Sequence, residues 1–119
     1  MQTVVETPPF LASANGAGMS DAERTAAVDL IAANPAAGEV IVGGGGVRKM
    51  RVPGHGKGKS GGSRILTYFM SDDRPIYLMW VINKSMAANL TAKQKTALKN
   101  AAKEIRDAQD HRARVYAPR

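Results

Sequence analysis

The sequence predicts an α+β fold in which a few helices pack on a mostly antiparallel sheet. A helix signal near the N-terminus precedes a run of strand-like segments, turns rather than helices separate most of these segments, and a second helix signal follows them. With 119 residues the chain can bury one core of modest size, and it contains no internal repeat. We expect one domain over residues 1–119, with residues 110–119 as a tail.

The first third of the chain holds one short strand and two helical segments. Residues 3–7 have the pattern of a strand that a pair of prolines stops, and residues 10–18 predict a turn or two of helix. A clearer helix begins at Ser20, because Ser20 and Glu23 have the spacing of a capping box. An Asn-Pro pair ends this helix at residue 34.

The rest of the chain predicts a meander of strands and a long final helix. Strands are expected over residues 39–42, 47–52, 63–70 and 76–82. The last of them is apolar throughout, as in a central strand that is covered on both faces. Thr91 and Gln94 have capping-box spacing and begin the final helix. The buried stripe of this helix is predicted to be Leu98, Ala101, Ile105 and Ala108.

The net charge of +7 is unevenly distributed along the chain. Residues 1–46 hold one basic residue and five acidic ones, whereas residues 47–119 hold sixteen basic residues and five acidic ones. Such a basic segment favours a polyanionic partner, because each phosphate that a cation neutralises releases counterions. On charge alone, an acidic protein or a membrane surface stays open as a partner.

Several kinds of site and location are disfavoured. The chain has no cysteine, which excludes disulfides and thiolate metal sites, and its two histidines, His55 and His111, are isolated from each other. The N-terminus lacks the basic and apolar regions of a signal peptide, and the longest apolar run, residues 76–82, is too short to span a bilayer. We expect a soluble, cytoplasmic protein that uses no metal or cofactor and binds no membrane.

Two cationic strand-like segments flank a glycine-rich loop. Lys49 and Arg51 alternate with apolar residues on the first segment, and Arg64 lies near the start of the second. If these three side chains project from one face of the sheet, they repel one another unless an anion lies among them. We interpret this face as an RNA-binding surface rather than a solvated face with splayed side chains. Tyr68, on the face of Arg64, either contacts a base or is a half-buried strand tyrosine.

The loop itself, GHGKGKSGG, is not a P-loop. The spacing of a P-loop requires glycine where the chain has Pro53, and it requires a helix where residues 63–70 predict a strand. Nucleotide hydrolysis is therefore rejected. A flexible basic loop that closes on a nucleic-acid backbone fits better than an ordinary surface loop, with Lys57 and Lys59 as its cations and His55 as a helper in binding.

Catalysis on this surface would depend on cations, because no Asp or Glu lies between Val40 and Ser71. Arginine clamps phosphate oxygens in a bidentate manner. Lysine accepts a proton only when its charged form is destabilised, and the neighbouring arginines make Lys49 the candidate. A stripe on the final helix is either a solvated face or a contact to RNA or to an acidic protein; it consists of Lys95, Lys99, Lys103 and Arg106.

Three pieces of the sequence follow one another in a recognisable order: NPAAGEVIVGGGGVRKMRV, then GKGKSGGSRILTYF and, after an apolar strand, INKSMAANLTAKQKTAL. Together they resemble the HigB branch of the RelE/ParE superfamily of bacterial toxins, over about residues 3–105. The resemblance implies a small RelE-like fold with two N-terminal helices and a C-terminal helix on the sheet. It also implies a toxin that enters the ribosomal A site and cuts mRNA, and a cognate HigA-like helix-turn-helix antitoxin.

In the chemistry that the resemblance implies, the ribose 2′-hydroxyl attacks the adjacent phosphodiester without a metal. The family's catalytic positions fall on Lys49, Arg51, Arg64, Tyr68 and Lys84. Lys49 is the implied general base, Arg51 and Arg64 stabilise the pentacoordinate phosphate, and either Lys84 adds charge stabilisation or Arg64 protonates the leaving oxygen. RNA contacts are expected from Arg48, His55, Lys57, Lys59, Lys95 and Lys99. Operator DNA is reached only through the antitoxin.

The chain departs from the family pattern after Lys84. An acidic, polar stretch often follows that lysine in relatives, whereas here the residues are SMAAN, and Ser85 and Thr91 stand where some relatives have a basic residue and a tyrosine. These departures predict weaker or differently specified activity. Two other functions stay open: a non-catalytic RNA- or ribosome-binding module, and a gyrase-poisoning ParE-like toxin, against which the full set of cations argues.

Replacing Lys57 and Lys59 with alanine is predicted to weaken ribosome binding, because these side chains supply affinity for the phosphate backbone rather than chemistry. The salt dependence of binding should flatten by about 1 unit of slope for each phosphate contact that is lost. Titrations of labelled ribosomes at several salt concentrations measure the slope. An unchanged slope in the double variant would show that the loop lies outside the interface.

Overall fold

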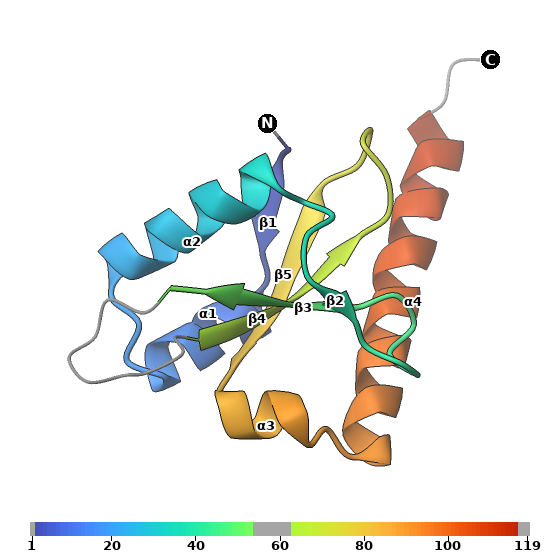
Figure 1. The fold of residues 1–119 in the computed structure, drawn as a ribbon. Helices are drawn as coiled ribbons and strands as arrows, with labels where there is room; N and C mark the ends of the chain where they lie inside the picture. The colour runs from blue at the N-terminus through green and yellow to red at the C-terminus, as the bar shows by residue number, and fades with distance from the viewer. Residues whose placement is uncertain (1, 54–62, 117–119) are drawn as a thin grey trace.

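Five strands form one sheet, which helices cover on both faces (Figure 1). The structure, a computed structural model, describes residues 2–53 and 63–116. The strands are β1 (Val4–Glu6), β2 (Glu39–Val40), β3 (Arg48–Val52), β4 (Ser63–Phe69) and β5 (Ile76–Ile82). The helices are α1 (Pro8–Gly16), α2 (Asp21–Ala33), α3 (Lys84–Ala88) and α4 (Ala92–Tyr116).

The sheet has the strand order β1-β5-β4-β3-β2. The N-terminal strand β1 pairs with β5 in parallel, and all other neighbours are antiparallel. The predicted α+β class and mostly antiparallel sheet are thus confirmed. Strand β5 lies inside the sheet, between β1 and β4, and helices cover it on both faces, which agrees with its apolar sequence.

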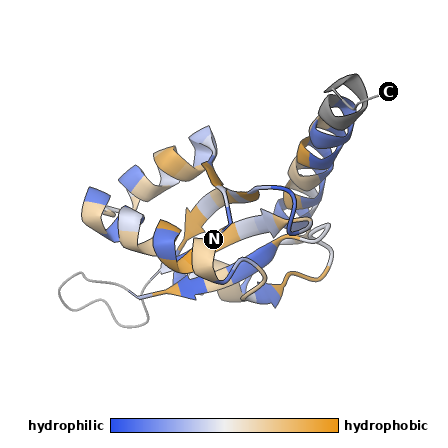
Figure 2. Cartoon of the chain, turned by 90° about the horizontal axis from the view of Figure 1, so that it is seen from above, coloured by the Kyte–Doolittle hydropathy of each residue, from blue (hydrophilic) through white to orange (hydrophobic). Residues whose placement is uncertain are grey.

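Two apolar cores lie on opposite faces of the sheet. The first joins α1 and α2 to the sheet through residues that include Phe10, Ile31 and Ile65. The second joins α3 and α4 to the sheet through residues that include Leu66 and Leu98. Figure 2 shows hydrophobic residues where the helices face the sheet and hydrophilic residues along the outer side of α4. The sheet is therefore the middle layer of three.

The start of α1 differs from the prediction, because the helix begins at Pro8 rather than at Phe10. Proline is favourable in the first turn of a helix, where its missing N–H would have no intrahelical partner. Thr7 caps the helix: its hydroxyl accepts a hydrogen bond from the Phe10 N–H at 3.3 Å and donates one to the Leu78 carbonyl at 2.7 Å. The prolines that stop β1 therefore also begin the helix that packs on β5.

Both predicted capping boxes are present. At the start of α2, the Glu23 N–H donates to the Ser20 hydroxyl at 3.1 Å and the Ser20 N–H donates to the Glu23 carboxylate at 3.0 Å. Before α4, the Gln94 N–H donates to the Thr91 hydroxyl at 3.1 Å and the Thr91 N–H donates to the Gln94 amide oxygen at 2.8 Å. Each box satisfies two backbone donors that have no intrahelical partner.

Two element boundaries correct the prediction. Strand β2 ends at Val40 rather than at residue 42, because the chain turns back on itself: the Ile41 N–H donates to the Val47 carbonyl at 2.9 Å. Helix α4 continues to Tyr116, beyond residue 110, where a tail was expected to begin. In the predicted stripe of α4, Ala108 is exposed, and the half-buried Gln109 instead donates a hydrogen bond to the Tyr77 hydroxyl.

A test of this fold compares alanine at Gly38 and at Gly18. Both glycines have positive φ, 98° and 75°, so each substitution is expected to cost about 1–2 kcal/mol of backbone strain. A Cβ at Gly38 would also lie 2.7 Å from the Lys49 carbonyl oxygen, whereas one at Gly18 would meet nothing within 4 Å. We predict that Gly38→Ala lowers the free energy of unfolding by a further ~1–3 kcal/mol. Urea denaturation measures the free energy of unfolding of both variants. Equal losses of stability in the two variants would contradict the close approach of Gly38 to the Lys49 carbonyl.

Candidate functional site

The cationic side chains predicted to share a face line one hollow, here called the cation hollow, of about 320 Å³. It lies where β3 and β4 meet α3. Its lining residues are Glu39, Lys49, Arg51, Arg64, Lys84, Ala87 and Ala88. Four of the five predicted catalytic residues are therefore together, and their roles stay predictions.

Strand register directs the cations into the hollow. Arg51 lies opposite Arg64, and Lys49 lies opposite Leu66, in the antiparallel pairing of β3 with β4. The alternate residues Met50 and Ile65 belong to the core on the other face of the sheet. Successive side chains of a strand point to opposite faces of the sheet. Because Met50 and Ile65 are buried on one face, the cationic side chains that alternate with them point to the other face, where α3 lies.

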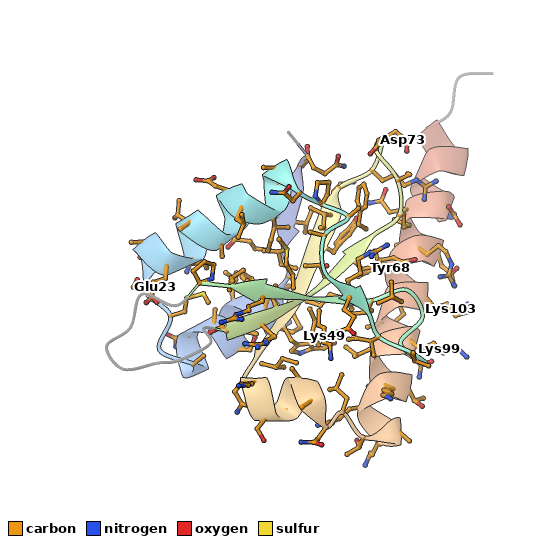
Figure 3. The ribbon with its side chains drawn as sticks, viewed as in Figure 1. Glu23, Lys49, Tyr68, Asp73, Lys99 and Lys103 are labelled. Carbon is orange, nitrogen blue, oxygen red and sulfur yellow. The ribbon has the colours of Figure 1, made fainter. Side chains whose placement is uncertain are left out.

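Lys49 is held at the rim of the hollow by two oxygen atoms. Its ammonium group donates a hydrogen bond to the Ala87 carbonyl at 3.2 Å and lies 3.5 Å from the Glu39 carboxylate. The Lys49 side chain is 29% exposed, and that of Glu39 is 77% exposed, so water screens this ion pair and its contribution to stability is small. The contacts fix where the lysine points. Figure 3 shows Lys49 between the sheet and α3.

Glu39 is a residue of the site that the sequence reasoning missed. The stretch from Val40 to Ser71 contains no acid. Glu39 precedes this stretch, and the pairing of β2 with β3 sets it directly opposite Lys49. Opposite charges in facing positions of neighbouring strands attract each other, which was the available signal.

The short helix α3 was also not predicted, although it forms one wall of the hollow. Asn83 caps it, since its side-chain oxygen accepts a hydrogen bond from the Met86 N–H at 2.8 Å. The buried Ala87 packs in the core under α4, and this contact fixes the position of Lys84 at the first residue of the helix. An asparagine before a run of good helix formers is a signal that could have predicted α3.

Tyr68 lies apart from the other predicted catalytic residues. It is only 5% exposed, and its hydroxyl accepts a hydrogen bond from the Arg106 guanidinium at 3.3 Å. This hydrogen bond raises the pKa of Arg106 above its ordinary value. Figure 3 shows Tyr68 beside α4 rather than at the cation hollow. Of the two interpretations of Tyr68, burial in the sheet is the one that its geometry favours.

The remaining predicted RNA contacts divide into three groups. His55, Lys57 and Lys59 lie outside the described residues. Lys95 and Lys99 lie on α4 and do not line the cation hollow. Arg48 begins β3 and donates a hydrogen bond to the Gly38 carbonyl at 3.3 Å, outside the lining of the hollow.

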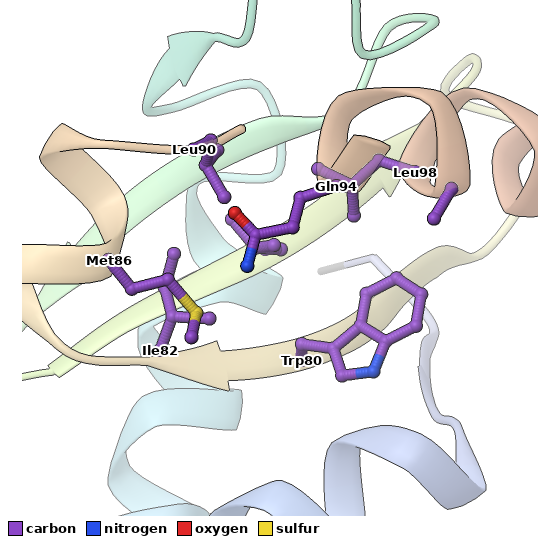
Figure 4. A pocket seen from close by; sticks show the side chains of 8 residues that line it. Trp80, Ile82, Met86, Leu90, Gln94 and Leu98 are labelled. Atoms are coloured by element: carbon purple, nitrogen blue, oxygen red, sulfur yellow. The ribbon is translucent and has the colours of Figure 1, made fainter. Parts of the chain in front are cut away.

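A second, apolar hollow of about 190 Å³ lies between β5 and the two C-terminal helices (Figure 4). Trp80, which the sequence placed in the core, is half-buried and lines this hollow with Met86 and Leu90. A bulge in the pairing of β4 with β5 shifts the register after Leu66. It brings both Met79 and Trp80 to the α4 face of the sheet.

The cation hollow has a mostly positive lining. Four cationic side chains and one carboxylate line it, and guanidinium groups match the oxygens of phosphate. Among the residues that the structure describes, no three His, Asp or Glu side chains gather into a possible metal site. Within the same ranges, no helix is long and apolar enough to cross a membrane.

The family model of the RelE toxin of the RelE / RelB toxin–antitoxin system matches residues 3–115. The chain belongs to the RelE toxin family. It is therefore the toxin of a toxin–antitoxin system, and an antitoxin is its partner. Toxins of this family generally inhibit translation and are generally endoribonucleases. The match extends beyond residue 105, where the resemblance read from the sequence stopped, and includes most of α4.

Proposed function

We propose that this toxin is a ribosome-dependent mRNA endonuclease of the HigB-like branch, paired with a HigA-like helix-turn-helix antitoxin. The observation that supports this proposal is the convergence of Lys49, Arg51, Arg64 and Lys84 on one hollow. These residues come from β3, β4 and α3, so three separate elements present cations to the same space. A phosphodiester in that space would meet positive charge from several sides.

The reaction we propose begins with the 2′-hydroxyl of the nucleotide before the scissile bond. Its oxygen attacks the adjacent phosphorus while Lys49, once deprotonated, accepts its proton. Arg51 and Arg64 stabilise the charge that develops on the phosphate oxygens. The bond from phosphorus to the 5′-oxygen breaks, and Arg64 or Lys84 returns a proton to that oxygen. The products are a 2′,3′-cyclic phosphate and a 5′-hydroxyl.

We further propose that cleavage depends on the ribosome. Cations can hold a phosphate, but a phosphate contact alone does not bring the 2′-hydroxyl in line with the leaving oxygen. Positioning of this kind can be worth about 7–11 kcal/mol when reacting groups are fully aligned. A codon held along a fixed path in the A site would supply part of that alignment.

The decisive variant for the cation hollow is Arg64→Ala. We expect it to abolish growth inhibition, because removal of one donor that stabilises a transition state typically lowers the rate about 10²–10³-fold. Arg24→Ala is the matched control: Arg24 lies on α2 and pairs with Glu6 at 3.1 Å, away from the hollow. Growth curves after induction and mapping of new 5′ ends on mRNA measure the effect. Antitoxin binding and circular dichroism verify that each variant folds.

The same assays separate the rival functions. Inhibition of growth without new mRNA ends would favour a non-catalytic ribosome-binding module, and DNA damage without mRNA cleavage would favour the gyrase-poisoning branch. If Arg64→Ala stops growth as wild type does at equal expression, the catalytic assignment of the hollow is wrong.

A further inference from the structure

A second basic hollow lies where the start of β3, the turn between β4 and β5, and α4 meet. It has a volume of about 500 Å³, and arginines from three elements line it: Arg48 of β3, Arg74 of the turn between β4 and β5, and Arg106 of α4. The lining also contains Tyr68 and one acidic residue, Asp110. We call it the arginine hollow.

Each of these arginines is held by a different oxygen atom. Arg74 pairs with the Asp110 carboxylate at 2.9 Å. Arg106 donates to the Tyr68 hydroxyl at 3.3 Å, and Arg48 donates to the Gly38 carbonyl at 3.3 Å. Two of the three partners are neutral, and the lining holds one carboxylate for three guanidinium groups. Asp107, which does not line the hollow, also acts on Arg106. Like charges gathered in this way are unfavourable unless an anion lies among them.

We propose that the arginine hollow binds one phosphate group of an RNA strand and is separate from the cation hollow. A guanidinium presents a planar fork of donors that fits phosphate oxygens, and the contacts to Tyr68 and Asp110 orient two of these forks in advance. On this account Tyr68 is a positioning residue for Arg106. The proposal rests on the proposed function only for the identity of its ligand, RNA.

The proposed function points to RNA rather than an acidic peptide as the ligand of this hollow. Arg48 and Arg51 line the arginine hollow and the cation hollow, respectively. They point to opposite faces of β3, because successive side chains of a strand alternate and Met50 lies in the core on the face away from the cation hollow. The two hollows are therefore separate sites rather than one groove. An RNA strand carries a phosphate at every nucleotide, so it has one to offer to each site.

The test measures binding of a fluorescent single-stranded 2′-O-methyl RNA, which lacks the attacking hydroxyl, at several salt concentrations. We expect Arg74→Gln with Arg106→Gln to weaken binding and to reduce the slope of log affinity against log salt by about 0.7, the loss of one phosphate contact. Arg24→Gln with Lys93→Gln removes the same charge from α2 and from the start of α4, outside both hollows, and should leave the slope unchanged.

The outcomes separate the possibilities. An unchanged slope in the arginine double variant, or an equal loss in the control, overturns the proposal. So does a variant that keeps its RNA affinity but loses affinity for an oligoglutamate peptide. If the double variant does not fold, Arg48→Gln takes its place, since it removes only a hydrogen bond to a backbone carbonyl among the contacts described. Because the readout is binding rather than cleavage, failure of the endonuclease assignment would leave this result standing.

Discussion

The antiparallel register between β3 and β4 is the constraint on which the rest of the site depends. It sets Arg51 opposite Arg64 and Lys49 opposite Leu66, so all of these side chains emerge on one face. A slip of one residue would turn the cations into the core on the α1 side and expose the apolar set. Burial of residues such as Ile65, which is fully enclosed, therefore fixes where the charges point.

Like charges directly opposite each other across a sheet are unfavourable, and the pair of Arg51 and Arg64 is of this kind. The same face of β4 carries Leu66 and Tyr68, which α4 covers. Core and site thus share one face of the sheet: α4 closes the apolar part, and α3 forms the wall of the charged part. Proteins often have lower stability at functional sites than they could have. On this face of β4, Leu66 and Tyr68 contribute to the core, whereas Arg64 lines the cation hollow.

The sequence predicts best those features that depend on local periodicity. The alternation around Lys49 and the capping pair at Ser20 identify their elements because neighbouring residues alone determine them. Features that arise from pairing of distant segments are harder to predict. Glu39 becomes a neighbour of the hollow only through the pairing of β2 with β3. Tyr68 is buried because α4, whose Leu98 lies 30 residues later, packs in the same core. Helix α3 has only five residues, too few for a helical period to be recognised.

We propose that the cations on this face cut mRNA only when the ribosome holds the codon. The most direct test incubates the purified toxin with one mRNA in two states, free in solution and bound to programmed 70S ribosomes with an empty A site. The account predicts rapid cleavage within the A-site codon and little cleavage of the free mRNA, because the cations hold phosphate but do not align the 2′-hydroxyl. Comparable cleavage rates in the two samples would contradict it and would indicate a free ribonuclease.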